Sequence, residues 1–193
     1  MKGKALLVFA ILALTGASAW AQSPYDEDLW VGGHLSFWNT DEFTNGIGAG
    51  VDVWLDVGWG FTVRASGTHF RDFDIKVGPF MIDIEINQAS GTLMYNFIEG
   101  HFRSPLAVYL GGGYDYNWVD AEADLGATVD FEDGDGWHAV AGARWALDPG
   151  VSIFAEAVYR DFETDATAGG GLVAINPQVF TGWGFAVGVM FGF

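Results

Sequence analysis

Cysteine is absent from this chain of 193 residues, and basic residues are scarce. Eight lysines and arginines stand against 25 aspartates and glutamates, which gives a formal net charge of −17. With so few basic residues, the protein has no surface suited to neutralising phosphates, which argues against nucleic acid as a partner. Without cysteine, no disulfide stabilises the fold.

Long apolar runs are also missing, apart from one near the N-terminus. Two lysines precede the apolar residues 5–14, and small residues follow as far as Ala19-Trp20-Ala21. A basic start, a short apolar run and an Ala-x-Ala site are typical of a secretory signal peptide. We therefore expect residues 1–21 to be a signal peptide and residues 22–193 to form one domain. The alternative, a membrane anchor, would need about 20 apolar residues.

What the chain does contain is a regular alternation at its C-terminus. From Gln178 to Phe193 every second residue is large and apolar, with Thr181 as the exception, and the residues between them are mostly small. A period of two indicates a β-strand. A bulky apolar face opposite a face of small residues is typical of a barrel strand with lipid outside and a narrow, crowded lumen inside.

Seven further segments alternate in a similar way. Together with the C-terminal segment, the predicted strands are about 29–38, 46–57, 61–70, 81–98, 106–118, 137–147, 151–162 and 178–193. Most of them exceed the roughly 9–11 residues that a tilted strand needs to cross a bilayer. Because a closed sheet satisfies its own backbone, such strands are stable in lipid without disulfides.

The fourth predicted strand breaks its own pattern. Ile82, Ile84 and Ile86 share one parity, whereas Leu93 and Tyr95 share the other. A β-bulge within 87–91 would reconcile the two halves. Alternatively, the isoleucines face inward above the membrane or belong to a long extracellular hairpin. We favour the bulge.

The connections between the predicted strands alternate between short and long. The short ones are 56–60, 99–105 and 148–150, and the long ones are about 39–45, 71–80, 119–136 and 163–177. This order predicts an all-β fold: an eight-stranded antiparallel up-and-down transmembrane β-barrel with short periplasmic turns, long extracellular loops and both termini in the periplasm. A soluble barrel such as a lipocalin is the competing architecture, but it would bury its apolar residues inside.

The N-terminal segment, the eight alternating segments and the closing Val187-Gly-Val-Met-Phe-Gly-Phe193 together resemble the small eight-stranded outer-membrane barrels typified by OmpA and OmpX. The resemblance covers the whole expected mature chain and is architectural. It implies a monomer in the bacterial outer membrane, in contact with lipid and lipopolysaccharide. The aromatic C-terminus at Phe193 resembles the signal that the barrel-assembly machinery reads.

Aromatic side chains are expected to form girdles at the two membrane interfaces, because their rings favour the headgroup level. The residues expected at the periplasmic interface are Trp30, Trp59, Phe97 and Phe102, and those expected near the outer interface are Tyr116, Trp118 and Trp183.

Charged residues alternate with outward apolar residues on several strands, which points them into the lumen. The predicted lumen charge network consists of Asp52, Arg64, Arg144, Glu156 and Arg160. A buried charge needs a partner, so we expect the two carboxylates to pair with the three arginines, with His138 and His34 nearby. Such a network has two interpretations: a polar plug that stabilises the barrel, or a gate whose ion pairs switch to open a narrow channel.

An enzyme is a further alternative, because His34 and Ser36 lie two residues apart and share one face of a strand. Nucleophilic catalysis by serine needs a base and an acidic group that orients it, and no acidic residue has a convincing position beside this pair. We therefore assign no catalytic residue, no cofactor and no metal site, and interpret the pair as lining the lumen.

The segment from Asp120 to Asp135 carries seven acidic residues and no basic one. The stretch 130–136 resembles the spacing of oxygen ligands around calcium, although the terminal glutamate of an EF-hand loop is missing. It is either a solvated acidic loop or a weak site for divalent cations that bridge to lipopolysaccharide. The predicted function is a non-catalytic outer-membrane barrel with a structural or surface-interaction role; a narrow gated pore or a lipid-modifying enzyme are the alternatives.

Overall fold

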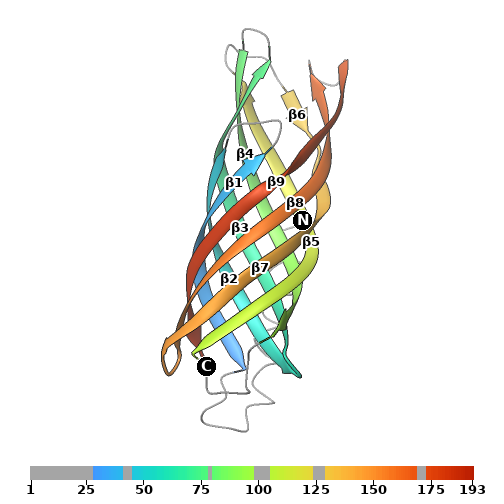
Figure 1. Ribbon diagram of the computed structural model, residues 1–193. Helices are drawn as coiled ribbons and strands as arrows, with labels where there is room; N and C mark the ends of the chain where they lie inside the picture. Colours follow the sequence, from blue (N-terminus) through green and yellow to red (C-terminus); the bar gives the residue numbers. More distant parts are fainter. Residues whose placement is uncertain (1–27, 41–44, 78–79, 98–104, 124–128, 169–172) are drawn as a thin grey trace.

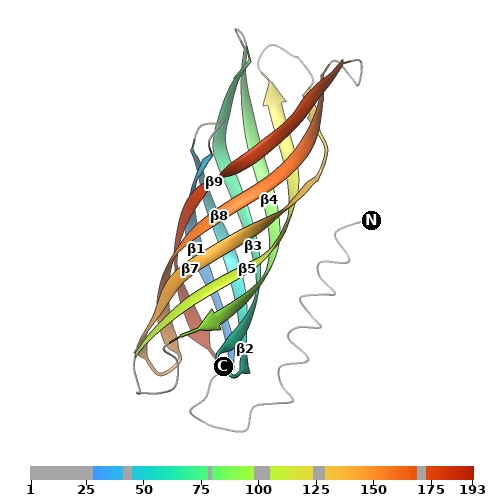
Figure 2. The ribbon, with the colours of Figure 1, turned by 45° about the vertical axis from the view of Figure 1, so that its right-hand side comes forward.

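The computed structural model describes residues 28–40, 45–77, 80–97, 105–123, 129–168 and 173–193. They form one tall barrel of tilted strands (Figures 1 and 2). The strands are β1 (Leu29–Thr40), β2 (Gly46–Gly58), β3 (Phe61–Val77), β4 (Phe80–Asn96), β5 (Leu106–Ala123), β6 (Val129–Phe131), β7 (Gly134–Asp148), β8 (Val151–Ala168) and β9 (Val173–Gly192). No helix among these residues is long and apolar enough to span a membrane.

Antiparallel pairing closes the sheet. Consecutive strands pair from β1 to β5, β5 pairs with β7, and β8 pairs with both β7 and β9. β1 returns to pair with β9 from Trp30 opposite Gly192 to Thr40 opposite Gly182. The short β6 and β7 both pair with β8 and together form one interrupted strand around the ring. The predicted closed eight-stranded antiparallel barrel is therefore confirmed, and closure pairs the first and last strands, β1 and β9, which would otherwise be open edges.

The side chains alternate as the sequence predicts. On β9, Phe185 and Val187 are exposed whereas Ala186 and Met190 are buried, and the outward residues form an apolar outer wall. On β1, Leu35 is outward while His34 is buried. A soluble barrel would show the reverse arrangement, with apolar residues inside and polar ones outside.

The fourth strand corrects one prediction. Ile84 and Ile86 are buried in the lumen, while β4 pairs without a break with both of its neighbours from Ile86 to Tyr95. The irregularity lies instead in β3, where the register shifts between Phe70 and Phe73. This bulge turns the inward face of β3 from even to odd positions, so that Phe70 and Phe73 both point inward beside the isoleucines. The bulge predicted within 87–91 was wrong, and the alternative of inward isoleucines is correct.

Several strands are longer than alternation predicted. β3, β5 and β8 continue into segments assigned to the long connections, so the barrel wall extends there as paired strand.

At the end of the barrel opposite these extensions, the β2–β3 turn has positive φ at Gly58, Trp59 and Gly60, which the two glycines adopt without steric cost. We call the end where β1 begins and β9 ends the terminal end, and the opposite one the distal end (Figure 1). The predicted signal peptide, 1–21, lies outside the described residues.

The lumen is packed in three layers. An apolar terminal cluster consists of Trp30, Trp54, Met94, Tyr109, Val140, Phe154, Val158, Ala186 and Met190. An apolar distal cluster consists of Trp38, Phe70, Phe73, Ile84, Ile86, Val119, Phe162 and Phe180. Asp52, Arg64, Asp115 and Glu156 are among the charged side chains between them, while Asp56 and Arg144 lie toward the terminal end. Trp30 thus packs inside the barrel and not in the outer girdle expected for it, because its even position on β1 faces inward.

Contact of the outer wall with lipid can be tested by placing a charge on it. Leu35 on the wall is 63% exposed, and Trp59 in the β2–β3 turn is 96% exposed. Leu35→Arg is expected to lower the free energy of unfolding by about 2–4 kcal/mol if it lies near the bilayer midplane, whereas Trp59→Arg at an interface costs about 0–1 kcal/mol. Urea unfolding in phospholipid vesicles measures both. Equal, small effects would mean that water and not lipid covers Leu35.

Candidate functional site

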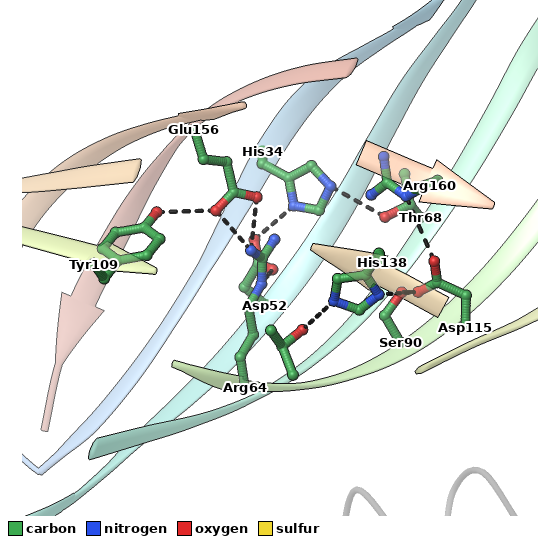
Figure 3. Close-up of polar contacts among 11 residues, drawn as sticks. His34, Asp52, Arg64, Thr68, Ser90, Tyr109, Asp115, His138, Glu156 and Arg160 are labelled. Atoms are coloured by element: carbon green, nitrogen blue, oxygen red, sulfur yellow. Dashed lines mark hydrogen bonds and ion pairs between the residues drawn. The ribbon is translucent and has the colours of Figure 1, made fainter. Parts of the chain in front are cut away.

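The middle layer of the lumen is organised around Arg64, which the inward parity of β3 places in the barrel interior. Its Nε donates to Asp52 Oδ1 at 2.7 Å, and its Nη1 donates to Glu156 Oε1 and Oε2 at 2.7 and 2.9 Å. The Tyr109 hydroxyl donates to the same Glu156 at 2.9 Å. These side chains come from β2, β3, β5 and β8 and converge in the lumen (Figure 3). One buried guanidinium therefore bridges two buried carboxylates, which is the condition for charges to be tolerated inside a protein.

His34 extends this group on β1. Its Nδ1 lies 2.5 Å from Asp52 Oδ2, and its Nε2 lies 3.1 Å from the Thr68 hydroxyl. The imidazole rests on Gly50, where a Cβ would come within 2.5 Å of the ring. The absence of a side chain at Gly50 thus lets His34 reach the carboxylate two residues further along β2.

His138 repeats this arrangement on the other side of the lumen. Its Nδ1 lies 2.8 Å from Asp115 Oδ1, and its Nε2 lies 2.9 Å from the Thr92 hydroxyl. Its ring rests on Gly113, two residues before Asp115, where a Cβ would come within 2.6 Å. Asp115 also accepts a hydrogen bond from Ser90 at 2.5 Å. The lumen therefore holds two units of histidine, aspartate, glycine and threonine.

The predicted network is only partly one cluster. Arg64, Asp52 and Glu156 meet in one group, whereas the other two arginines lie beside other carboxylates. Arg144 lies 3.5 Å from Asp56, and Arg160 lies 3.7 Å from Asp115. Inward parity put all five residues in the lumen, but their height along the barrel depends on strand register, which the alternation does not specify.

Sequence reasoning missed Asp115 and Tyr109, although the signal for both is present. Asp115 stands between the outward Tyr114 and Tyr116, and Tyr109 stands between Val108 and Leu110. The alternation that identified Arg64 would have placed both side chains in the lumen.

All three lumen arginines lie against rings of the apolar clusters, and Arg144 is 4.8 Å from the Trp30 ring and 5.8 Å from the Trp54 ring. The Arg64 guanidinium lies 5.5 Å from the Trp54 ring and 5.6 Å from the Phe154 ring, both in the terminal cluster. Arg160 lies 5.6 Å from the Trp38 ring, in the distal cluster. Cation–π contacts of this kind allow a charge to border an aromatic surface. The lumen is thus filled from the middle layer towards both ends.

His34 and Ser36, the pair considered as a possible catalytic site, are not arranged for catalysis. The Ser36 hydroxyl is buried and has no hydrogen-bond partner, whereas both ring nitrogens of His34 are engaged by Asp52 and Thr68. No base is therefore aligned to activate Ser36. Among the described residues, no group of three or more histidines or acidic residues is placed to hold a metal ion.

The acidic segment 120–135 is only partly described. Two of its carboxylates lie on the outer surface and accept hydrogen bonds from tyrosines: Asp133 from Tyr116 at 2.8 Å, and Asp135 from Tyr114. The side chains of 121–131 lie outside the described residues.

Comparison with known proteins agrees with this geometry. The family described as "Outer membrane protein beta-barrel domain" matches residues 7–193. Among curated proteins, none matches the chain significantly.

Solved structures with the same fold include OprG from Pseudomonas aeruginosa, with 16% identity, a TM-score of 0.72, and coverage of 88% of this chain and 97% of that chain. Neisserial surface protein A has 16% identity and a TM-score of 0.60 over 86% of this chain and 96% of that one. Outer membrane protein W of E. coli has 18% identity and a TM-score of 0.53 over 89% and 100%. At these identities the similarity establishes the fold alone.

Removing the central cation tests the energetic role of the network. Arg64→Met leaves Asp52 and Glu156 buried without their guanidinium and is expected to cost about 3–5 kcal/mol of unfolding free energy. Arg144→Met should cost less, because its partner Asp56 is partly exposed and also accepts a hydrogen bond from Thr62. Urea unfolding in the same vesicles compares the two variants; an Arg64→Met loss no larger than that of Arg144→Met would contradict the assignment.

Proposed function

The chain belongs to the outer membrane protein β-barrel family, and on that premise we propose that it is a non-catalytic barrel whose lumen is closed at neutral pH. Its role is structural and surface-directed: the distal end of the barrel meets lipopolysaccharide, ions or partner molecules. The bacterial outer membrane is where this family resides.

The observation that carries the proposal is the filling of the lumen. Trp38, Phe70 and Phe180 in the distal cluster, and Met190 in the terminal cluster, have no exposed surface. Between the clusters, Arg64 is bonded on both sides to buried carboxylates. An eight-stranded barrel is just wide enough for side chains to fill it, so packing of this kind leaves no continuous water path.

A lipid-modifying enzyme has less support. His34 is engaged by Asp52 and Thr68, and the Ser36 hydroxyl has no partner that would activate it. Both side chains are also buried, whereas a lipid substrate approaches from the outer wall or from the barrel ends. These contacts favour a role for the pair in packing.

The surface role rests on charge. Exposed acidic residues gather where the strands extend toward the distal end: Asp83, Glu85, Asp120, Glu132, Asp133, Asp135, Glu163 and Asp165. We place this end outside the cell and the termini in the periplasm, where the terminal strand ending at Phe193 would be read by the barrel-assembly machinery. Carboxylates at the level of the lipopolysaccharide phosphates repel these phosphates unless divalent cations bridge the two groups. We propose that the barrel is a monomer surrounded by lipid.

Ion conductance at neutral pH tests the closed lumen. The purified protein, shown to be folded by its altered gel migration without boiling, is expected to give no single-channel steps in a planar bilayer at about pH 7.5, because the packed lumen excludes water. A general porin serves as the positive control. Reproducible steps from the folded protein would make a pore the leading function.

Magnesium dependence tests the surface role. We expect Mg²⁺ to raise the unfolding temperature in bilayers containing lipopolysaccharide and not in phosphatidylcholine, because only the former offers phosphates to bridge. Replacing Asp133, Asp135 and Glu163 by their amides should reduce this shift. The same shift in both bilayers would point to cation binding by the protein alone, and no shift would remove the bridging proposal.

A further inference from the structure

His138 and Arg160 lie directly opposite each other on β7 and β8, and both point into the lumen. They share one carboxylate: Asp115 Oδ1 lies 2.8 Å from His138 Nδ1, and Asp115 Oδ2 lies 3.7 Å from Arg160 Nε (Figure 3). Like charges directly opposite each other on paired strands destabilise the pairing. When His138 is neutral, the charge of Arg160 is balanced by Asp115. When His138 is protonated, two cations share that one carboxylate.

Arg160 is held loosely for a buried cation. Its Nε has no hydrogen-bond partner, and its ion pair with Asp115 is longer than the 2.7 Å contact between Arg64 and Asp52. Its guanidinium lies over Trp38 at 5.6 Å and over Phe70 at 5.5 Å. Arg160 thus links Asp115 to the aromatic rings that fill the distal half of the lumen.

The charges around His138 leave no spare anion. Its paired strands contribute Asp115 and Tyr109 from β5 and Arg160 and Glu156 from β8, and Glu156 already binds Arg64. From β4 it meets the Thr92 hydroxyl, with Ser90 beside it on Asp115. Across the lumen stand His34 on β1, Asp52 on β2 and Arg64 on β3. A proton on His138 therefore gives two cations to the single carboxylate of Asp115.

His34 likewise has an aspartate beside Nδ1 and a threonine hydroxyl beside Nε2, but its electrostatic setting is the opposite. Beside it, Asp52 and Glu156 provide two carboxylates for the one guanidinium of Arg64. The residues opposite His34 on β2 and β9 are Gly50 and Gly188, so no cation faces it across either strand pair. A proton on His34 completes the charge balance, whereas a proton on His138 upsets it.

Protonating His138 costs no hydrogen bond of its own. A threonine hydroxyl either donates to a neutral imidazole nitrogen or accepts from a protonated one, and Thr92 lies 2.9 Å from Nε2. The other ring nitrogen, Nδ1, lies 2.8 Å from Asp115 Oδ1 without a hydrogen bond of good geometry, so no hydrogen bond is lost there either. A protonated His138 therefore repels the Arg160 guanidinium, and a shift of Arg160 alters its contacts with Trp38 and Phe70.

We propose that His138, Asp115 and Arg160 form an acid-responsive latch, in which protonation of His138 displaces Arg160 from Asp115 and loosens the distal aromatic cluster so that ions pass. The latch rests on the proposed closure of the lumen at neutral pH. It adds a trigger, the imidazole of His138, and a moving part, the guanidinium of Arg160.

Conductance at two pH values tests the latch. Acidification from about pH 7.5 to about pH 5 spans the range in which imidazoles titrate, and the wild-type protein, which shows no steps at about pH 7.5, should show a rise to reproducible single-channel steps at about pH 5. His138→Gln should abolish the rise, because glutamine takes no proton. His34→Gln is the matched control, with the same chemical change in the unit that lacks an opposed cation, and it should keep the rise.

A second variant and a second measurement keep the latch testable if His138→Gln does not fold. Arg160→Met keeps an unbranched side chain against Trp38 and Phe70 without the charge, and it should stay closed in acid. Because the chain has no cysteine, a single cysteine at Val119 in the distal cluster reports opening by its rate of modification with a membrane-impermeant thiol reagent. A single cysteine at the exposed Glu163 corrects for the pH dependence of the reagent.

The expected result is an acid-induced rise in the Val119→Cys rate relative to the Glu163→Cys rate, which disappears in the Arg160→Met background. Conductance that is equal at both pH values, or a rise that persists in folded His138→Gln, would overturn the latch. Steps already present at neutral pH would instead refute the closed lumen itself, so the two proposals fail in distinguishable ways.

Discussion

Pairing of β1 with β9 is the contact on which the other features depend. Within lipid, backbone amides and carbonyls find no water, so a sheet is stable there only when its two edge strands pair with each other. Closure after eight strands fixes a lumen just wide enough for side chains. Large rings then require small neighbours in the opposing wall: at Gly188 a Cβ would come within 2.4 Å of the Phe154 ring. The small inner residues of β9 are therefore a consequence of closure.

The layered lumen follows from the cost of burying charge. Asp52, Arg64 and Glu156 form a compact bonded group, and buried ions of this kind are tolerated only when each has its partner. The aromatic clusters on both sides withhold water from the group, which strengthens its electrostatic interactions and raises the cost of any imbalance. Each of the two histidines lies beside an aspartate and a threonine, but only His138 faces an arginine on the next strand. The proposed difference in their response to a proton rests on that arginine.

The sequence supported the prediction of the barrel better than that of the site. A period of two specifies which residues face inward, and Arg64, Arg144 and Arg160, assigned to the inner face in this way, are buried. It does not specify which inward residues meet, because contacts across the lumen depend on strand tilt and register. Alternation therefore did not indicate that Arg144 lies beside Asp56 and Arg160 beside Asp115.

The sequence by itself determined the strand class, the number of strands and the lipid-facing wall, because these depend on local alternation and on the size of each residue. Tertiary structure decided the rest. The change of parity along the fourth strand predicted a bulge in β4, but the structure has the bulge in β3 and the isoleucines inward. Which strand carries the bulge depends on the packing of Phe70 and Phe73 in the distal cluster. The opposition of His138 and Arg160 likewise exists only once β7 and β8 are paired in register, because they are 22 residues apart in the chain.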